Sequence, residues 1–377
     1  MAGPHPALFD IAAGRPLRAV HDLERLSASA VEHHMAGLLW SCVLRGEIDG
    51  PTAWKSDLAR LDLQVEGRHR VLWQRIADVT GRLEAIGVQV AVLKGVPAEH
   101  RWYDRMGERP SVDVDLLVAP DSLGRADEIV AELQPAHPLR GSVQESFERG
   151  ICQSIDLRVD GVSVDLHLDL FKLGLPSHDP DRLWKRTVSI ACDGGQVVRV
   201  LDAELSLVHL MVHMNRDSYR WLLGFSDVRR ILERETIDWD EVRVLAVQEG
   251  IEVPVWAGLT AVAPVIDVAG PAVTPGGWRM RLWGVLWRPS VRLQGNLGFM
   301  RYRHRFRWLP LVTDARPRDV LRWQWAQLVL SAPVANDVNA GRQGPWWWRL
   351  VRGRLSREVK RRRTIAQLRK AEERQAG

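Results

Sequence analysis

A chain of 377 residues with 46% hydrophobic and 26% charged residues is long enough to bury a large core, which excludes a disordered protein and a small disulfide scaffold. The net charge of +5 is unevenly distributed, because residues 345–377 hold eleven Lys or Arg and three Glu, a net of +8, and the remaining chain carries −3. The pI near 9.4 therefore reflects the tail and does not indicate that the whole protein binds nucleic acid.

The cysteines and the apolar stretches bear on the compartment. Cys42, Cys152 and Cys192 fit neither a zinc site nor an even disulfide framework, which favours a reducing environment. The first residues show no basic segment followed by an apolar run, the pattern of a secretory signal peptide. The most apolar stretch, 253–273, contains three prolines and an aspartate, which argues against a membrane span. We therefore expect a cytoplasmic protein.

Residues 1–86 are predicted to form a helical region, because apolar residues recur there at the spacing of a buried helix face. The residues that carry this pattern are Ala36, Leu39, Trp40 and Val43, followed by Leu61, Val65, Val71, Leu72, Ile76, Val79 and Leu83. Gly87 has the position of a glycine that ends a helix. The β-branched run from Val88 to Leu93 then predicts a buried strand.

Residues 87–201 are predicted to form an α/β core. The elements expected after the first strand are a short helix that ends near Tyr103, a loop at 107–110, a strand at 112–118, a helix at 120–133, and strands at 151–159 and 162–170. The last two strands flank Asp160-Gly161, a pair typical of a β-hairpin turn.

The pattern returns to helices beyond Asp202. Apolar residues at helical spacing predict a helical domain over 202–275, with helices at 205–214, 221–232 and 239–247. The final region, 276–377, has a different composition, since nine of the seventeen tryptophans follow Gly277 and are interleaved with arginine. We expect a Trp/Arg-rich C-terminal region that ends in a basic tail.

The predicted strand 112–118 carries two carboxylates on one face. Side chains alternate along a strand, so Asp113 and Asp115 point one way while Val114 and Leu116 point the other way. The two Cα atoms should be about 7 Å apart, close enough for both carboxylates to converge on a divalent cation. Nucleotidyl transfer uses such carboxylates, because hard cations offset the charge of a triphosphate and align the reacting oxygens.

The predicted strand 162–170 repeats this alternation. Its polar face carries Ser163, Asp165, His167 and Asp169, opposite a row of core residues. Asp165 is therefore a third candidate carboxylate, suited to hold a metal or to accept the proton of an attacking hydroxyl.

Two basic residues are candidates for contacts with phosphate. The turn Lys94-Gly95 joins a strand to a helix, where exposed backbone N–H groups and the helix dipole favour an anion and a lysine adds a point charge. The glycine allows a close approach of the backbone. Arg109, four residues before Asp113, is a candidate for a second phosphate clamp.

The order of these motifs resembles the uncharacterised bacterial nucleotidyltransferases of the DNA polymerase β-like superfamily. The similar segments are Leu93-Lys94-Gly95, Tyr103, Arg109 to Val118, Val164 to His167, Leu207 to His213 and Trp221 to Val228. The resemblance covers roughly residues 20–260. It implies an α+β fold, in which a polymerase β-like core with a small mixed sheet and helices is flanked by N-terminal and C-terminal helical regions.

The resemblance also implies roles for particular residues. Asp113, Asp115 and Asp165 would be catalytic residues and metal ligands, with Mg²⁺ or Mn²⁺ as the cofactor. The nucleotide-binding residues implied are Lys94, Gly95, Arg109 and Ser111. In the wider superfamily a Gly-Ser pair begins the first helix and its serine contacts phosphate. This chain has Lys94-Gly95 at that place, so phosphate would be bound with a different local geometry.

Four further residues are candidates for a supporting layer around the site. His209 and His213 have the spacing of zinc ligands on a helix, but no glutamate completes an H-E-x-x-H pattern, so a structural or supporting role is expected. His167 shares a face with Asp165 and either lines the cleft or packs as a hydrogen-bonded core histidine. Asp227 matches a family position, and a helix cap explains it equally well.

The expected activity is transfer of a nucleoside monophosphate from a nucleoside triphosphate, with ATP as a candidate, to a hydroxyl or phosphate of a small molecule, peptide or protein. One alternative is a catalytically silent nucleotide-binding or adaptor protein that acts through its C-terminal region. Three convergent carboxylates favour the enzyme, since a silent protein has no need of them. The other alternative, modification of nucleic-acid ends, needs a basic groove near the site, whereas the basic surplus lies in the tail.

The tail combines the run Trp346-Trp347-Trp348 with dense positive charge up to Arg363. This composition is compatible with an anionic membrane surface, a nucleic acid, an acidic protein partner or a solvated helix.

Truncation after Gly344 should leave triphosphate binding intact and remove an electrostatic interaction made by the tail. Co-sedimentation with anionic liposomes and gel shifts with mixed RNA, at low and high salt, measure this interaction, because salt screens exposed charges beyond about 8 Å at physiological ionic strength. If the full-length protein binds neither ligand at low salt, the membrane and nucleic-acid partners are excluded. If truncation abolishes triphosphate binding, the tail is part of the active site.

Overall fold

The computed structural model describes residues 4–266, together with residues 278 and 281. The gaps within this range are 18–19, 138–140, 142, 149–152, 172–178, 192–194, 196, 218 and 220. Apart from two positions, the Trp/Arg-rich region and its basic tail lie outside the described residues. The domain boundaries expected at 86, 201 and 275 stay predictions.

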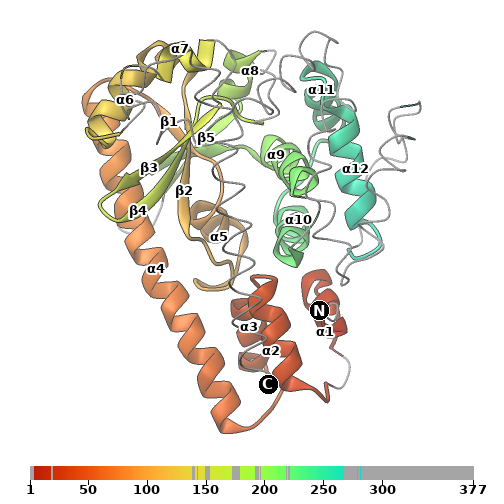
Figure 1. Cartoon of the computed structure of the whole chain (residues 1–377). Helices are drawn as coiled ribbons and strands as arrows, with labels where there is room; N and C mark the ends of the chain where they lie inside the picture. The colour runs from red at the N-terminus through yellow and green to blue at the C-terminus, as the bar shows by residue number, and fades with distance from the viewer. Residues whose placement is uncertain are drawn as a thin grey trace, which may run out of the picture.

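Four helices precede the sheet, and the last of them is much the longest. They are α1 (Pro6–Ala13), α2 (Leu23–Glu32), α3 (Ala36–Leu44) and α4 (Thr52–Ala85). Helix α4 runs along one side of the molecule from the N-terminal helices to the sheet (Figure 1). It ends as predicted at Gly87, which has a φ of 72°, and the amide of Val88 donates to the Leu83 carbonyl at 2.9 Å. This is the glycine-terminated helix end that the sequence indicates.

The buried face of α4 differs in part from the predicted face. Its fully buried residues are Leu58, Asp62, His69, Leu72, Ile76, Val79 and Leu83. Val71 was expected on this face but is 49% exposed. Two polar residues, Asp62 and His69, instead occupy core positions, and each must find a hydrogen-bond partner inside the protein.

Six strands form one mixed sheet in the order β3-β4-β2-β1-β6-β5. The strands are β1 (Val90–Val92), β2 (Asp113–Val118), β3 (Ser154–Val159), β4 (Val162–His167), β5 (Thr187–Ala191) and β6 (Val197–Leu201). The four strands predicted from the sequence are present, and the hairpin turn has positive φ at Asp160 and Gly161. Strands β5 and β6 were not predicted. Strand β5 is an edge strand in which Val188 and Ile190 alternate with polar residues but are not buried.

Several predicted boundaries differ from the observed ones, including those of β1 and β3, which are shorter than predicted. Strand β2 begins at Asp113, and Val112 is 65% exposed instead of buried. Strand β4 ends at His167, so Asp169 lies beyond it and accepts from the Phe171 amide at 3.1 Å. The segment 120–133 is a 3₁₀ helix, η1 (Pro120–Arg125), followed by α6 (Ala126–Leu133).

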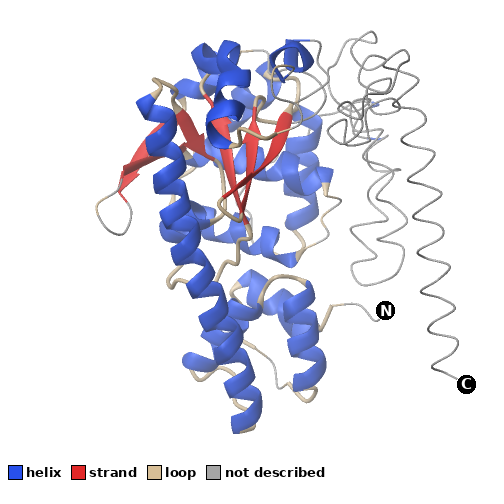
Figure 2. Cartoon of the chain, turned by 60° about the vertical axis from the view of Figure 1, so that its left-hand side comes forward, coloured by secondary structure: helices blue, strands red, loops and turns tan. Residues whose placement is uncertain are grey.

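The sheet is covered on both faces by apolar clusters. One face packs Val114, Leu116 and Val164 against α4 and α6. The other face packs Ala91, Leu93 and Leu117 in a cluster with the remaining helices (Figures 1 and 2). These helices include α5 (Val96–Trp102), α9 (Ala203–Arg216), α10 (Leu222–Arg234), α11 (Trp239–Gln248) and α12 (Glu252–Val262). Two short helices, α7 (Val143–Glu148) and α8 (Pro180–Lys185), lie beside η1.

The fold is α+β, with a mixed sheet between helical regions, as the sequence predicts. In the described part of the chain, no helix has the length and apolar composition needed to cross a membrane.

Two glycines near the end of α4 should respond in opposite ways to alanine. Gly87→Ala should destabilise the protein by about 1–2 kcal/mol, because its positive φ is strained for a residue with a Cβ. Gly81→Ala should stabilise it by about 0.5–1 kcal/mol, because Gly81 lies inside the helix and its Cβ would meet open space. Urea denaturation measures both, and equal shifts in one direction would contradict the helix end described above.

Candidate active site

Two parallel strands bring the predicted carboxylates together. Strands β2 and β4 pair so that Asp115 lies opposite Asp165 and Asp113 lies opposite Ser163. Since Val114 and Val164 are buried against α4 and α6, the aspartates point toward the other face of the sheet. The alternation predicted for both strands is therefore present, and the register, which the sequence did not give, sets Asp115 and Asp165 side by side.

Asp115, Asp165 and His167 offer three ligand atoms that lie within 4.8 Å of one another. The His167 Nε2 atom is 3.1 Å from Asp115 Oδ1 and 3.4 Å from Asp165 Oδ2. Asp115 and His167 are only 2% and 1% exposed. Within the described residues this is the one group of three such side chains close enough to hold a metal ion. Asp113, also expected as a ligand, lies at the start of β2 and is not part of this group.

The cluster carries more negative than positive charge. The Lys94 ammonium lies 3.2 Å from Asp115 Oδ2 and compensates part of the negative charge of this carboxylate. Burial and the Asp115 carboxylate raise the pKa of Asp113, and Lys94 offsets part of this rise. The Asp115 and Asp165 carboxylates thus both disfavour a negative charge on Asp113, in addition to the effect of burial.

The Lys94-Gly95 turn lies against Ser111. Gly95 precedes α5 with a φ of 77°, and a Cβ at this position would stand 2.7 Å from Ser111 Oγ. A larger residue would therefore be excluded both by its backbone conformation and by space. The Ser111 hydroxyl donates to the Asp113 carbonyl at 3.2 Å, so the turn, Ser111 and the start of β2 form one packed unit.

Arg109 and Asp227 form a buried ion pair. Arg109 Nε and Nη2 donate to the two carboxylate oxygens of Asp227 at 2.7 and 2.9 Å, and the Tyr103 hydroxyl donates to Asp227 Oδ1 at 2.7 Å. Asp227 lies inside α10, so the alternative explanation of a helix cap is wrong. Burial alone would lower the pKa of Arg109, but the Asp227 carboxylate outweighs it and raises this pKa. Burial, together with Asp227, raises the pKa of Tyr103.

A cavity of about 270 Å³ lies between these residues and helices α9 and α10. Nine of the predicted site residues line it: Lys94, Gly95, Arg109, Ser111, Asp113, Asp115, His209, His213 and Asp227. Asp165 and His167 are not in its lining, and His167 contacts the lining residue Asp115. Much of the remaining lining is apolar or aromatic and includes Trp102, Leu210, Met214 and Trp221.

His209 and His213 project from α9 into the cavity lining, with ring centroids 6.1 Å apart. Burial, and then the neighbouring His167, lowers the pKa of His209 well below its ordinary value. Burial and Arg216 lower the pKa of His213 in the same way. The lowered pKa favours the neutral form of both imidazoles. His213 Nδ1 lies 3.4 Å from Asp217 Oδ2, and neither histidine belongs to the group around Asp115.

The sequence patterns did not single out two buried polar residues beside this site, His69 and Glu99. His69 Nδ1 lies 2.5 Å from Glu99 Oε2, and its Nε2 accepts from the Ser111 amide at 3.0 Å. A signal for His69 was present, because it occupies a core position on α4 among Leu72 and Ile76. A polar residue on the apolar stripe of an amphipathic helix has to be paired inside the protein.

The sequence profile of a family described as uncharacterised nucleotidyltransferases matches residues 20–266, well over half of the chain. The chain therefore belongs to this family and is a nucleotidyltransferase. No curated protein shows a significant match. The family match covers all the residues that form the cavity and the group around Asp115.

Removal of the Asp227 carboxylate should strongly destabilise the protein. Asp227→Ala leaves the Arg109 guanidinium buried without its partner, so the free energy of unfolding should fall by about 3–5 kcal/mol. Asp57→Ala is a matched control, because Asp57 pairs with Arg60 on the surface and water screens that interaction. Urea denaturation compares the two variants. Similar small losses for both would show that the Arg109–Asp227 pair contributes little to the fold.

Proposed function

We propose that the protein transfers a nucleoside monophosphate from a nucleoside triphosphate to an acceptor hydroxyl or phosphate and releases pyrophosphate, at a site that contains Asp113, Asp115 and Asp165. The observation that carries this proposal is the parallel register of β2 and β4, which sets Asp115 beside Asp165 next to a cavity that Lys94 also lines. Membership in the nucleotidyltransferase family gives the reaction class.

The donor atoms fit a divalent metal ion. Two carboxylates and an imidazole lie within 4.8 Å of one another, and carboxylate oxygens are the ligands that Mg²⁺ and Mn²⁺ prefer. Asp115 and Asp165 would hold the ion, with Asp113 as the third carboxylate from the first position of β2. Bound there, the metal would neutralise phosphate charge and polarise the reacting oxygens. The burial of the Asp115 carboxylate beside Asp165 supports such binding.

The roles of the protein side chains follow from their positions. With a hydroxyl acceptor, its oxygen forms a bond to the α-phosphorus, the bond from that phosphorus to the bridging oxygen breaks, and pyrophosphate leaves. Asp165 would accept the proton of the hydroxyl. Lys94 would contact phosphate at the turn before α5. Arg109 uses Nε and Nη2 to bind Asp227, which leaves Nη1 to meet a phosphate oxygen.

The apolar part of the cavity would receive the nucleoside or the acceptor. Trp102, Trp221 and Met214 supply contact area, and a cavity of about 270 Å³ is close to the size range of small-molecule sites. The neutral His209 and His213 would donate or accept hydrogen bonds there. Their lack of charge makes them unsuited to bind phosphate as cations.

The triphosphate could be ATP or another nucleotide, and the acceptor is a small molecule, peptide or protein. The C-terminal basic tail would bind an anionic membrane surface, a nucleic acid or an acidic protein, and we propose a cytoplasmic location. The catalytically silent alternative and the nucleic-acid end-modifying alternative predict different results in the same experiment, described next.

Protein, Mg²⁺ and each labelled nucleoside triphosphate should be mixed with cell extract, and the labelled product identified. Wild-type protein should label an acceptor, whereas Asp113→Asn and Asp115→Asn should abolish labelling and metal-dependent triphosphate binding, because each removes a carboxylate from β2. Asp57→Asn, far along α4 on the surface, serves as the control. Binding without labelling supports the silent alternative, and labelled RNA supports end modification. Unchanged calorimetric titrations for both aspartate variants would overturn the site.

A further inference from the structure

The segment between α5 and β2 carries Arg109 and Ser111, and its backbone pairs with none of the six strands that the structure describes. Alternate residues of this segment donate their amides to two side chains instead. Glu99 Oε1 accepts from the amides of Gly107 at 2.9 Å and Arg109 at 2.8 Å, and His69 Nε2 accepts from the Ser111 amide at 3.0 Å. A buried carboxylate and imidazole thus satisfy three backbone donors that a strand edge would otherwise satisfy.

The hydrogen bonds fix the protonation of His69. Because Nε2 accepts from an amide, it carries no proton, so the ring proton is on Nδ1 and is donated to Glu99 Oε2. A doubly protonated ring would set an N–H group against the Ser111 N–H group. The imidazole is therefore neutral and Glu99 is ionised, a state that is compatible with the complete burial of His69 and the 4% exposure of Glu99.

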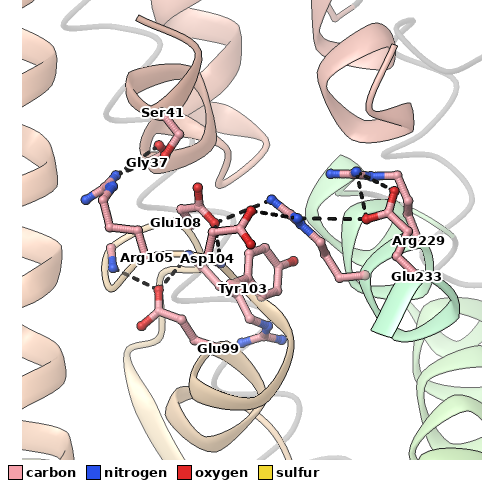
Figure 3. A network of polar contacts seen from close by, with 12 residues as sticks. Gly37, Ser41, Glu99, Tyr103, Asp104, Arg105, Glu108, Arg229 and Glu233 are labelled. Carbon is pink, nitrogen blue, oxygen red and sulfur yellow. Dashed lines mark hydrogen bonds and ion pairs between the residues drawn. The ribbon is translucent and has the colours of Figure 1, made fainter. Parts of the chain in front are cut away.

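Other contacts attach the same segment to the rest of the protein. Arg105 donates to both carboxylate oxygens of Asp62 on α4, at 2.6 and 2.7 Å. It also donates to Ser41 Oγ on α3 at 3.2 Å (Figure 3). On the other side, Arg230 of α10 lies 2.9 Å from Asp104 and 3.5 Å from Glu108. These ion pairs hold the segment between two helical regions. The His69–Glu99 pair differs from them, because two of its three amide partners belong to Arg109 and Ser111, which line the cavity.

We propose that Glu99 and His69 are positioning residues of the nucleotide site, which set the backbone from Gly107 to Ser111 so that Arg109 and Ser111 meet the phosphates. The proposal rests on the proposed function for its ligand, but the geometry of the pair is independent of it. Ser111 packs against the Lys94-Gly95 turn and bonds to the carbonyl of Asp113. A shift of the Ser111 amide would therefore move the start of β2 and the two proposed phosphate contacts of the segment, Arg109 and Ser111.

Glu99→Gln tests the tautomer. If the new amide group donates to His69, the ring must accept at Nδ1, and its proton moves to Nε2 and faces the Ser111 amide. If the amide group turns the other way, its N–H atoms face the amides of Gly107 and Arg109. Either arrangement breaks at least one bond to the segment, with almost no change in side-chain volume.

His69→Asn is a second variant, which covers the outcome that Glu99→Gln fails to fold. Its amide nitrogen can take the place of Nδ1 and donate to Glu99, but nothing reaches the Ser111 amide. Exchange of the Ser111 amide should then rise about tenfold while the amides of Gly107 and Arg109 stay protected. Asp62→Asn is the matched control, because it weakens the Arg105 attachment of the same segment and leaves the His69–Glu99 pair in place.

Three measurements decide the proposal: the ¹⁵N shifts of the His69 ring, exchange of the three amides, and calorimetric titration with each of the four Mg²⁺–ribonucleoside triphosphates. Wild-type protein should show the Nδ1–H form. Glu99→Gln should change the ¹⁵N shifts of the His69 ring or expose the amides to exchange. Both Glu99→Gln and His69→Asn should weaken triphosphate binding about tenfold. Asp62→Asn should lower the unfolding midpoint without changing the ring or the affinity.

The outcomes separate this proposal from the proposed function. The described hydrogen bonding of the His69–Glu99 pair is wrong if the wild-type ring carries its proton on Nε2. It is also wrong if amide exchange is unchanged in both Glu99→Gln and His69→Asn. The positioning role of the His69–Glu99 pair is wrong if the variants expose the amides but keep the triphosphate affinity of the wild type. It is also wrong if Asp62→Asn loses as much affinity as Glu99→Gln and His69→Asn. If the wild-type protein binds none of the four triphosphates, the proposed function and the positioning role both fail. The ring and amide measurements still decide the geometry of the pair.

Discussion

The parallel pairing of β2 with β4 is the constraint to which the rest of the site is adapted. It sets Asp115 directly opposite Asp165, two like charges on neighbouring strands. A repulsion of this kind is worth about 4 kcal/mol at 4 Å in a medium of effective dielectric constant 20. The Lys94 ammonium and the His167 imidazole both contact Asp115 and offset part of it. A slip of one residue along either strand would turn its carboxylates into the apolar core, so the register is strongly determined by burial.

The site also depends on helices far apart in the sequence. The segment from Tyr103 to Ser111 is bound on one side by His69 of α4 and on the other by Asp227 of α10. Because these contacts are ion pairs and hydrogen bonds to buried groups, each partner has a fixed direction as well as a distance. The sheet supplies the carboxylates, and the two helical regions fix the backbone that leads into them.

Much of the fold could be predicted from local patterns. The alternation in β2 and β4 predicted the shared face of Asp113, Asp115 and Asp165, because a strand has a period of two whatever its neighbours are. Strands β5 and β6 escaped prediction although both contain β-branched apolar residues, because each is only five residues long. The boundary errors arose because the alternation of apolar and polar residues continues past the strand ends, with Val112 before β2 and Leu168 and Leu170 after β4.

Pairings between distant residues could not be predicted. Arg109 and Asp227 are 118 positions apart, and His69 and Ser111 are 42 positions apart. Only the fold brings such groups together, and a hydrogen-bond partner leaves no mark in a single sequence. The polar residues on the core face of α4 indicated that partners exist, without indicating which ones.

The two walls of the cavity differ in charge, and this difference orients a ligand in the proposed function. The wall formed by the core carries Lys94, Arg109 and the carboxylates. The wall formed by α9 carries His209 and His213, whose pKa values burial lowers, beside apolar side chains, and its charged residue Asp217 lies at the end of the helix, next to His213. Since charged phosphates gain most where charges are fixed and poorly screened, a triphosphate would lie with its phosphates toward β2. The nucleoside or the acceptor would then face α9, where hydrogen bonds and apolar contacts are the interactions that remain.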